Sequence, residues 1–158
     1  MAIQVFAEMR TQLMRETQLS GPLRAMIVCK YTCPEVLSAA SRKTGWRITA
    51  VSPRPRNPAL GTPDDWEWRV LADFERRVAK GEPVEGMETS QVVTQPQGRF
   101  LRYARAVPVE ESCLACHGPR SSLPEPVKAQ LATDYPFDEA VGFTAGQLYG
   151  IVAIKRRF

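Results

Sequence analysis

The chain has 158 residues, of which 44% are hydrophobic and 24% charged, so it can bury the core of one domain and is too apolar to be disordered. Its net charge of +4 is mixed along the sequence except at Lys155-Arg156-Arg157, and no basic face with interleaved aromatic residues indicates nucleic-acid binding. No apolar run approaches the roughly eighteen residues that a membrane span needs.

The first third of the chain predicts two helices and a strand. Apolar residues recur at helical spacing over 3–19, and Gly21-Pro22 opens a second helix that runs over 20–43. Pro34 should kink this second helix, because proline lacks the N–H that a helical turn requires. Residues 46–51 then alternate between apolar and polar side chains, as a strand does.

The rest of the chain predicts one loop, two helices and three strands. Residues 52–63 hold four prolines and predict a long ordered loop. Thr62-Pro63-Asp64-Asp65 resembles a capping box that opens a helix to about Lys80. We expect strands over 87–95, 99–107 and 147–155, with a short helix over 127–132. This order of helices and strands predicts an α+β fold with an antiparallel sheet.

The four cysteines form two close pairs, Cys29 with Cys33 and Cys113 with Cys116. Close pairs are poor scaffolds for disulfides and are more typical of metal, redox or haem sites. The second pair stands in Cys-Leu-Ala-Cys-His, in which two thiols can add to the two vinyl groups of haem while His117 binds the iron. We therefore predict one covalent haem c, held by Cys113 and Cys116 with His117 as the proximal axial ligand.

Two other interpretations of this motif are a zinc site and a thioredoxin-like redox pair. Zinc would need a second pair, which Cys29 and Cys33 could supply. A thioredoxin-like pair gives no reason for the histidine that follows Cys116. His117 is the only histidine of the chain, and its place directly after the pair favours haem over both alternatives.

The distal ligand of the iron has several candidates, since no second histidine exists. They are Cys29, Cys33, a methionine, a lysine, water or an open position. The two cysteines share a helix face with Met26, although ordinary core packing explains this stripe equally well. A disulfide between them is awkward, because an intact helix holds residues four apart slightly too far from each other. A thiolate ligand would lower the iron potential, and methionine would raise it.

Several segments in order resemble the Tll0287-like family of haem-binding domains. They are Ala25 to Cys29 with Pro34, Ser52 to Pro58, Pro63 to Glu67, Ala106 to Gly118, and Tyr135 to Gly150. The resemblance covers roughly residues 22–156. It implies a PAS-like fold, with helices packed on one side of the sheet. We expect a single domain over 1–158, in which an N-terminal helix of about 2–20 precedes a haem domain of about 21–158.

The resemblance also implies ligation of the iron by histidine and cysteine, with Cys29 on the distal side. Cys33 is not part of the family pattern and leaves the distal assignment open by one helical turn. Arg54 and Arg56 are candidates to contact the haem propionates, because guanidinium groups suit carboxylates. A solvated loop explains the two arginines equally well.

The function implied by the resemblance is a periplasmic redox or gas sensor, in which NO or CO displaces the thiolate after reduction. The alternative is a periplasmic electron carrier with a redox partner protein. A haem enzyme ranks lowest, because no second histidine is present for acid–base chemistry.

Two further expectations concern assembly and location. The N-terminal helix could pair in a homodimer or pack on its own domain. Haem attachment to this motif takes place outside the cytoplasm, yet the sequence begins without a signal peptide. We therefore expect a periplasmic or otherwise extracytoplasmic protein whose signal or anchor segment is missing from this sequence.

Overall fold

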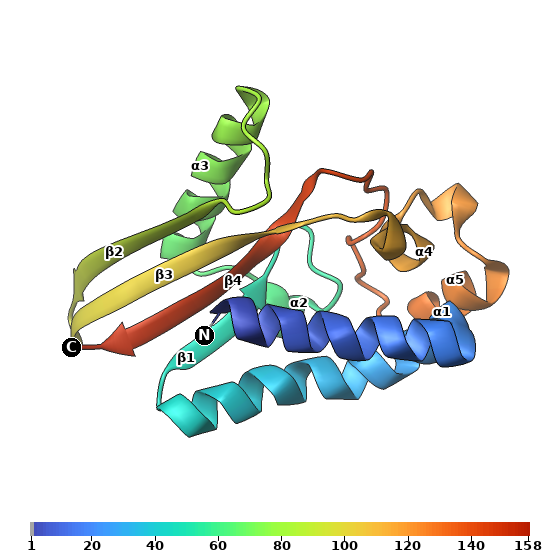
Figure 1. Ribbon diagram of the computed structural model, residues 1–158, viewed down its shortest axis with the longest axis horizontal. Helices are drawn as coiled ribbons and strands as arrows, with labels where there is room; N and C mark the ends of the chain where they lie inside the picture. Colours follow the sequence, from blue (N-terminus) through green and yellow to red (C-terminus); the bar gives the residue numbers. More distant parts are fainter. Residues whose placement is uncertain (1) are drawn as a thin grey trace.

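A four-stranded antiparallel sheet organises the fold, which the computed structural model describes over residues 2–158 (Figure 1). Met1 and the side chains of Ala2 and Ile3 lie outside the described part, so the predicted apolar role of Ile3 is not addressed. The strands are β1 (Arg47–Val51), β2 (Glu88–Gln95), β3 (Gly98–Pro108) and β4 (Leu148–Arg157), in the order β1-β4-β3-β2. The predicted α+β class is confirmed.

The helices are α1 (Ala2–Thr44), α2 (Pro58–Gly61), α3 (Asp65–Ala79), α4 (Leu114–His117) and α5 (Glu125–Asp134). Short 3-10 turns cover Glu111–Cys113 and Arg120–Ser122. Among the described helices, none is both long enough and apolar enough to cross a bilayer.

Helix α1 is a hairpin of two arms (Figure 1). Gly21 is its residue with non-helical dihedrals, and its φ of 79° lies in the left-handed region that favours glycine. Pro22 follows at the start of the second arm, where no N–H is needed. The two predicted helices are therefore present, joined by a single residue. The predicted kink at Pro34 does not break the helix, since the backbone stays helical there.

The two arms of α1 cover one face of the sheet, and α3 covers the other (Figure 1). Strand β4 serves both faces because successive side chains alternate: Ile151 and Ala153 join the cluster under α3, whereas Val152 and Ile154 join the cluster under α1. The expectation of helices on one side was therefore wrong. The unbroken apolar run at 151–154 is typical of a strand buried on both faces.

The cap of α3 lies two residues beyond the predicted Thr62. Asp64 accepts hydrogen bonds from the N–H groups of Trp66 (3.1 Å) and Glu67 (2.9 Å). The Glu67 carboxylate in turn accepts from the N–H of Asp64 at 2.7 Å, which completes a capping box. The Thr62 hydroxyl instead donates to the carbonyl oxygen of Pro58 at 2.6 Å, at the end of α2.

Candidate functional site

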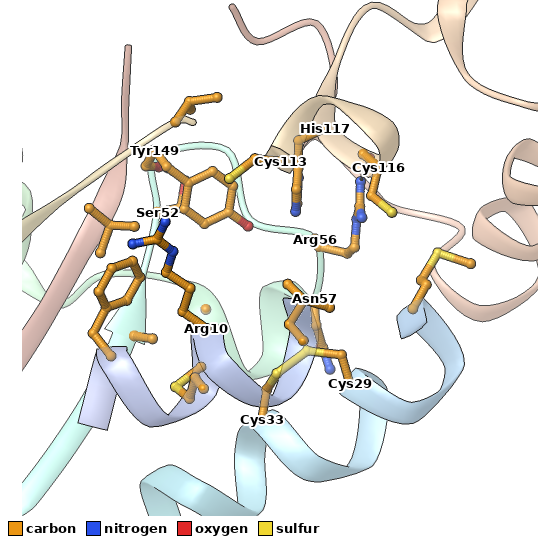
Figure 2. Close-up of a pocket in the computed structure, with 18 of the residues that line it drawn as sticks. Arg10, Cys29, Cys33, Ser52, Arg56, Asn57, Cys113, Cys116, His117 and Tyr149 are labelled. Atoms are coloured by element: carbon orange, nitrogen blue, oxygen red, sulfur yellow. Dashed lines mark hydrogen bonds between the residues drawn. A yellow bond between two sulfur atoms is a disulfide. The ribbon is translucent and has the colours of Figure 1, made fainter. Parts of the chain in front are cut away.

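A cavity of about 370 Å³ lies between the α1 hairpin and the segment that carries the Cys-Leu-Ala-Cys-His motif (Figure 2). This volume falls within the ~300–1,000 Å³ of small-molecule and cofactor sites. The α1 wall is apolar and comes from both arms: Phe6, Met9, Leu13, Met14, Met26 and Leu37. Cys113, Cys116 and His117 line the cavity from the other side, so the structure brings the three motif residues to one wall.

The motif forms one tight turn, in which Cys113 ends a 3-10 turn and α4 follows at once. Both Cys113 and Cys116 are free thiols, and burial raises the pKa of the Cys116 thiol. Gly118 ends the turn with its N–H on the carbonyl oxygen of Leu114 at 3.0 Å. A Cβ atom at Gly118 would lie 2.6 Å from that oxygen, so only glycine allows this close approach.

The imidazole of His117 points from α4 into the cavity (Figure 2). Its Nδ1 lies 2.8 Å from the carbonyl oxygen of Ala140, and because a carbonyl only accepts, Nδ1 carries the proton. The unprotonated Nε2 is then free to bind a metal. Burial, aided by the positive charge of Arg56, lowers the pKa of His117 to about 3. The ring is therefore a neutral ligand at ordinary pH.

Aromatic rings fix the plane of His117 from the side. Tyr149 meets the imidazole edge-on with ring centroids 4.9 Å apart, and Phe143 does so at 6.4 Å. Burial raises the pKa of Tyr149 to about 12, so its hydroxyl stays protonated at the cavity wall. The backbone adds a second support, since the N–H of Phe143 donates to the carbonyl oxygen of His117 at 2.9 Å. Sequence reasoning missed Tyr149, which stands at the start of the last strand with no motif of its own.

The two arginines predicted to contact propionates behave differently. Arg56 lines the cavity, pairs with Asp138 (3.2 Å), and donates to the carbonyl oxygens of Cys116 (2.6 Å) and Ala140 (3.0 Å). Arg56 therefore supports both the motif turn and the carbonyl that orients His117.

Arg54 is not among the residues that line the cavity. Its guanidinium lies 4.0 Å over the ring of Phe143 and donates to the carbonyl oxygens of Glu139 and Val141. The propionate contacts stay predictions, and the geometry favours Arg56 over Arg54.

Two further cations line the cavity from α1, and sequence reasoning missed both. Arg10 pairs with Glu110 at 2.5 Å, and Lys30 pairs with Asp134 at 2.9 Å. Both line the cavity and are partly exposed, Arg10 by 51% and Lys30 by 33%, so they lie at the rim of the apolar wall. Long basic side chains at such a rim can reach an anionic group while their stems stay apolar.

Cys29 and Cys33 form a disulfide in the second arm of α1, and both residues line the cavity (Figure 2). Their Cα atoms are 5.1 Å apart, within the disulfide range, so the expected helix geometry is not an obstacle. Pro34 has no N–H to bond the carbonyl of Lys30, which frees one hydrogen bond of this turn. A disulfide sulfur is not a thiolate, so the predicted iron ligation by Cys29 or Cys33 applies to the reduced pair.

The zinc interpretation needs both cysteine pairs in one place. Among residues 2–158, no group of three or more His, Cys, Asp or Glu side chains is close enough to hold a metal ion. The two pairs instead face each other across the cavity, one bonded and one free (Figure 2). Such walls suit a flat cofactor between them better than a single ion.

Comparisons with known proteins find one sequence family and one solved structure that resemble this chain. A sequence profile of the Tll0287-like family, described as Tll0287, matches residues 1–156. The crystal structure of the cyanobacterial heme-protein Tll0287 has a similar fold, with a TM-score of 0.71 and 22% sequence identity. The similarity covers 98% of this chain and 91% of that one. No curated protein matches the chain.

Proposed function

The chain belongs to the Tll0287-like family, and on this premise we propose that it is a mono-haem c-type cytochrome that senses redox state or a diatomic gas outside the cytoplasm. One observation carries the proposal. Cys113, Cys116 and His117 share one wall of an apolar cavity, with the two thiols free and the imidazole neutral. The heme-protein with the similar fold supports the same cofactor.

The residues of the chain fit a covalently bound haem. Each thiol would add across one vinyl group, with sulfur bonding to one carbon and hydrogen going to the other. Nε2 of His117 would bind the iron, because Nδ1 is held by the carbonyl oxygen of Ala140. Arg56 and Arg10 are the basic side chains that we expect near the propionates. The haem, once bound, supplies a one-electron iron couple and a coordination position for a ligand.

The distal side decides between sensor and carrier. We propose that Cys29, in its reduced form, is the distal ligand, since a thiolate is held less firmly by ferrous iron and would yield to NO or CO. The same wall also contains Met9, Met14 and Met26. A methionine ligand would instead favour a carrier that keeps both its ligands in the two redox states.

The disulfide supports an extracytoplasmic location. Disulfides form and persist in oxidising compartments such as the periplasm and are rare in the cytosol. The Cys29–Cys33 bond is therefore consistent with the compartment in which haem is attached to this type of motif.

The test is expression with a haem-attachment system, followed by a haem stain of the denatured chain and a pyridine haemochrome spectrum. We expect one covalent haem per chain, lost completely when Cys113 and Cys116 are both changed to Ala. Ferrous protein is then exposed to CO and to NO. A shift of the main absorption band supports the sensor, and an unchanged band with rapid electron exchange supports the carrier. Absence of covalent haem from the unaltered protein overturns the proposal.

A further inference from the structure

The Cys29–Cys33 bond joins two residues of the same helical arm, so it links no two elements of the fold. A structural cross-link normally connects segments that could otherwise separate. Here the second arm is helical on both sides of the pair, and its apolar contacts with the sheet come from Val36, Leu37 and Ala40, further along. Support of the fold therefore does not explain where this disulfide lies.

The position of the disulfide in the cavity offers an explanation. Both cysteines line the wall that faces Cys113, Cys116 and His117 (Figure 2). Both are half-buried and belong to the surface that a ligand in the cavity would meet. Because the two residues lie one helical turn apart on the same face, they stay in this wall whether the sulfurs are bonded or not. The oxidation state of the pair therefore changes the chemistry of the wall without any change of the fold.

We propose that Cys29 and Cys33 are a thiol–disulfide exchange site, reduced by a partner dithiol, that switches a sulfur ligand for the cavity on and off. This inference rests on the proposed function, because the ligand would serve haem iron. With the bond closed, neither sulfur is a thiolate and the distal side has no cysteine ligand. With the bond open, Cys29 offers its sulfur to the iron.

A partner dithiol supplies the two electrons that reduction of the Cys29–Cys33 disulfide requires. A partner thiolate attacks the Sγ atom of Cys33, the bond between the two sulfurs breaks, and Cys29 leaves as a thiolate. The second partner thiolate then attacks the mixed disulfide and releases Cys33. Two electrons pass from the partner to the pair, and the partner leaves as a disulfide. The partner dithiol also gives up two protons. One goes to the sulfur of Cys33. The other goes to the sulfur of Cys29, or to solvent if that sulfur binds iron as a thiolate.

The experiment uses the full haem-loaded chain, before and after treatment with dithiothreitol under anaerobic conditions. Acid-quenched alkylation and mass spectrometry count the free thiols, and electron paramagnetic resonance reads the ferric haem after the reductant is removed. We expect the treatment to expose two alkylatable thiols and to produce a low-spin thiolate signal that the oxidised protein lacks. Re-oxidation of the pair should remove both changes.

Three variants complete the test. Cys33→Ser cannot form the bond and keeps Cys29, so it should show the thiolate signal with or without dithiothreitol. Cys29→Ser should never show that signal. Thr32→Ala is the matched control, because Thr32 lies between the cysteines, donates to the carbonyl oxygen of Val28, and is not part of the cavity wall. It should respond as the unaltered protein does.

The outcomes separate this inference from the proposed function. Two thiols that appear on reduction without any change of the haem signal overturn the switch and leave the cytochrome standing. Thiols that are free in the purified protein and never join in the presence of oxidised dithiothreitol also overturn it. A chain without covalent haem overturns the proposed function, whereas alkylation still reports the state of the pair.

Discussion

The two faces of the sheet carry their helices in different ways. Helix α3 lies flat on one face, with Phe74 and Leu71 0% and 1% exposed. The α1 hairpin is buried on the sheet at Val5 and Val36, whereas the middle of its two arms lines the cavity. Both helical layers therefore pack on the sheet, but only the α1 side also leaves a cavity for a ligand. Substitutions on the α3 face should lower the free energy of unfolding and leave the cavity unchanged. Substitutions near the motif should change the cavity and have a smaller effect on stability.

Each region contains one arginine with little exposure, and the two arginines support different parts of the molecule. Arg102 on β3 is 1% exposed and pairs with Asp64 (2.9 Å) and Glu67 (3.4 Å), so it ties α3 to the sheet. Arg56 pairs with Asp138 and donates its other hydrogen bonds to the carbonyl oxygens of Cys116 and Ala140, beside His117. Arg102 therefore joins α3 to the sheet in the core, whereas Arg56 supports the backbone around His117.

The largest effect is expected for Phe74→Ala on the α3 face. Removing a fully buried ring leaves a cavity in the core and should lower the free energy of unfolding by about 3–5 kcal/mol. Urea denaturation followed by circular dichroism measures the loss. The haem absorption spectrum of the folded fraction should stay unchanged. A shifted spectrum would show that the two faces are coupled.

A smaller effect on stability, with a change at the haem, is expected for Asp138→Asn. The carboxylate pairs with Arg56 and is 3% exposed, so a neutral amide in its place leaves the mostly buried Arg56 cation without its counter-charge and should cost about 1–3 kcal/mol. Because Arg56 also donates to the carbonyl oxygen of Ala140, the orientation of His117 should change as well. Electron paramagnetic resonance of the ferric haem reads this change. An unaltered haem signal would contradict the supporting role of Arg56.

The smallest effect is expected at the cap of α3. Asp64→Asn should cost least, because it keeps the cap hydrogen bonds and removes only the charge that pairs with Arg102, whereas Asp64→Ala also removes the two cap hydrogen bonds, at a further cost of about 1 kcal/mol. Burial opposes ionisation of Asp64, yet hydrogen bonds from the Glu67 N–H and from Arg102 outweigh it and lower its pKa.

This lowered pKa gives the pH dependence a definite sign. A carboxyl whose pKa is depressed by folding stabilises the protein above its unfolded pKa, and this contribution is lost as the pH falls through the folded pKa. The stability difference between the unaltered protein and Asp64→Asn should therefore be full above about pH 4 and shrink below it. Urea denaturation at several pH values measures it. A difference that grows toward acid would contradict the assignment.

The elements and the motif were predictable from local patterns, because helical spacing, strand alternation and turn residues act over a few neighbours. The two predicted arms of α1, the strand of Ile151 and the helix of Phe74 are all present. The features that the sequence did not predict depend on contacts between segments far apart in the chain. Asp138 and Tyr149 meet the motif only through the fold, and Arg54 turns toward Phe143 for the same reason.

The cap of α3 and the disulfide escaped for a different reason, which is local competition. Thr62 was the expected cap, but its hydroxyl lies at the end of α2, where it donates to the carbonyl oxygen of Pro58, and the carboxylate of Asp64 caps α3. Cys29 and Cys33 were expected to lie slightly too far apart in a regular helix, yet their Cα atoms are 5.1 Å apart and their sulfurs are bonded. Periodicity shows which residues share a face of a helix. It does not show which hydrogen bonds or disulfides their side chains form.

The chain reverses direction at the single residue Gly21, so the two arms of the α1 hairpin run side by side from this point. Residues at equal counts from this point come to equal heights along the two arms: Leu13 and Cys29 each stand eight positions away, and Met9 and Cys33 each stand twelve positions away. All four line the cavity. Deleting one residue between Leu13 and Gly21 would turn the earlier part of the arm by about 100° and slide it by about 1.5 Å. The number of residues between Gly21 and each position of the first arm therefore decides which side chains face the cavity, and a one-residue length change there would replace those side chains and also turn Val5 away from the sheet.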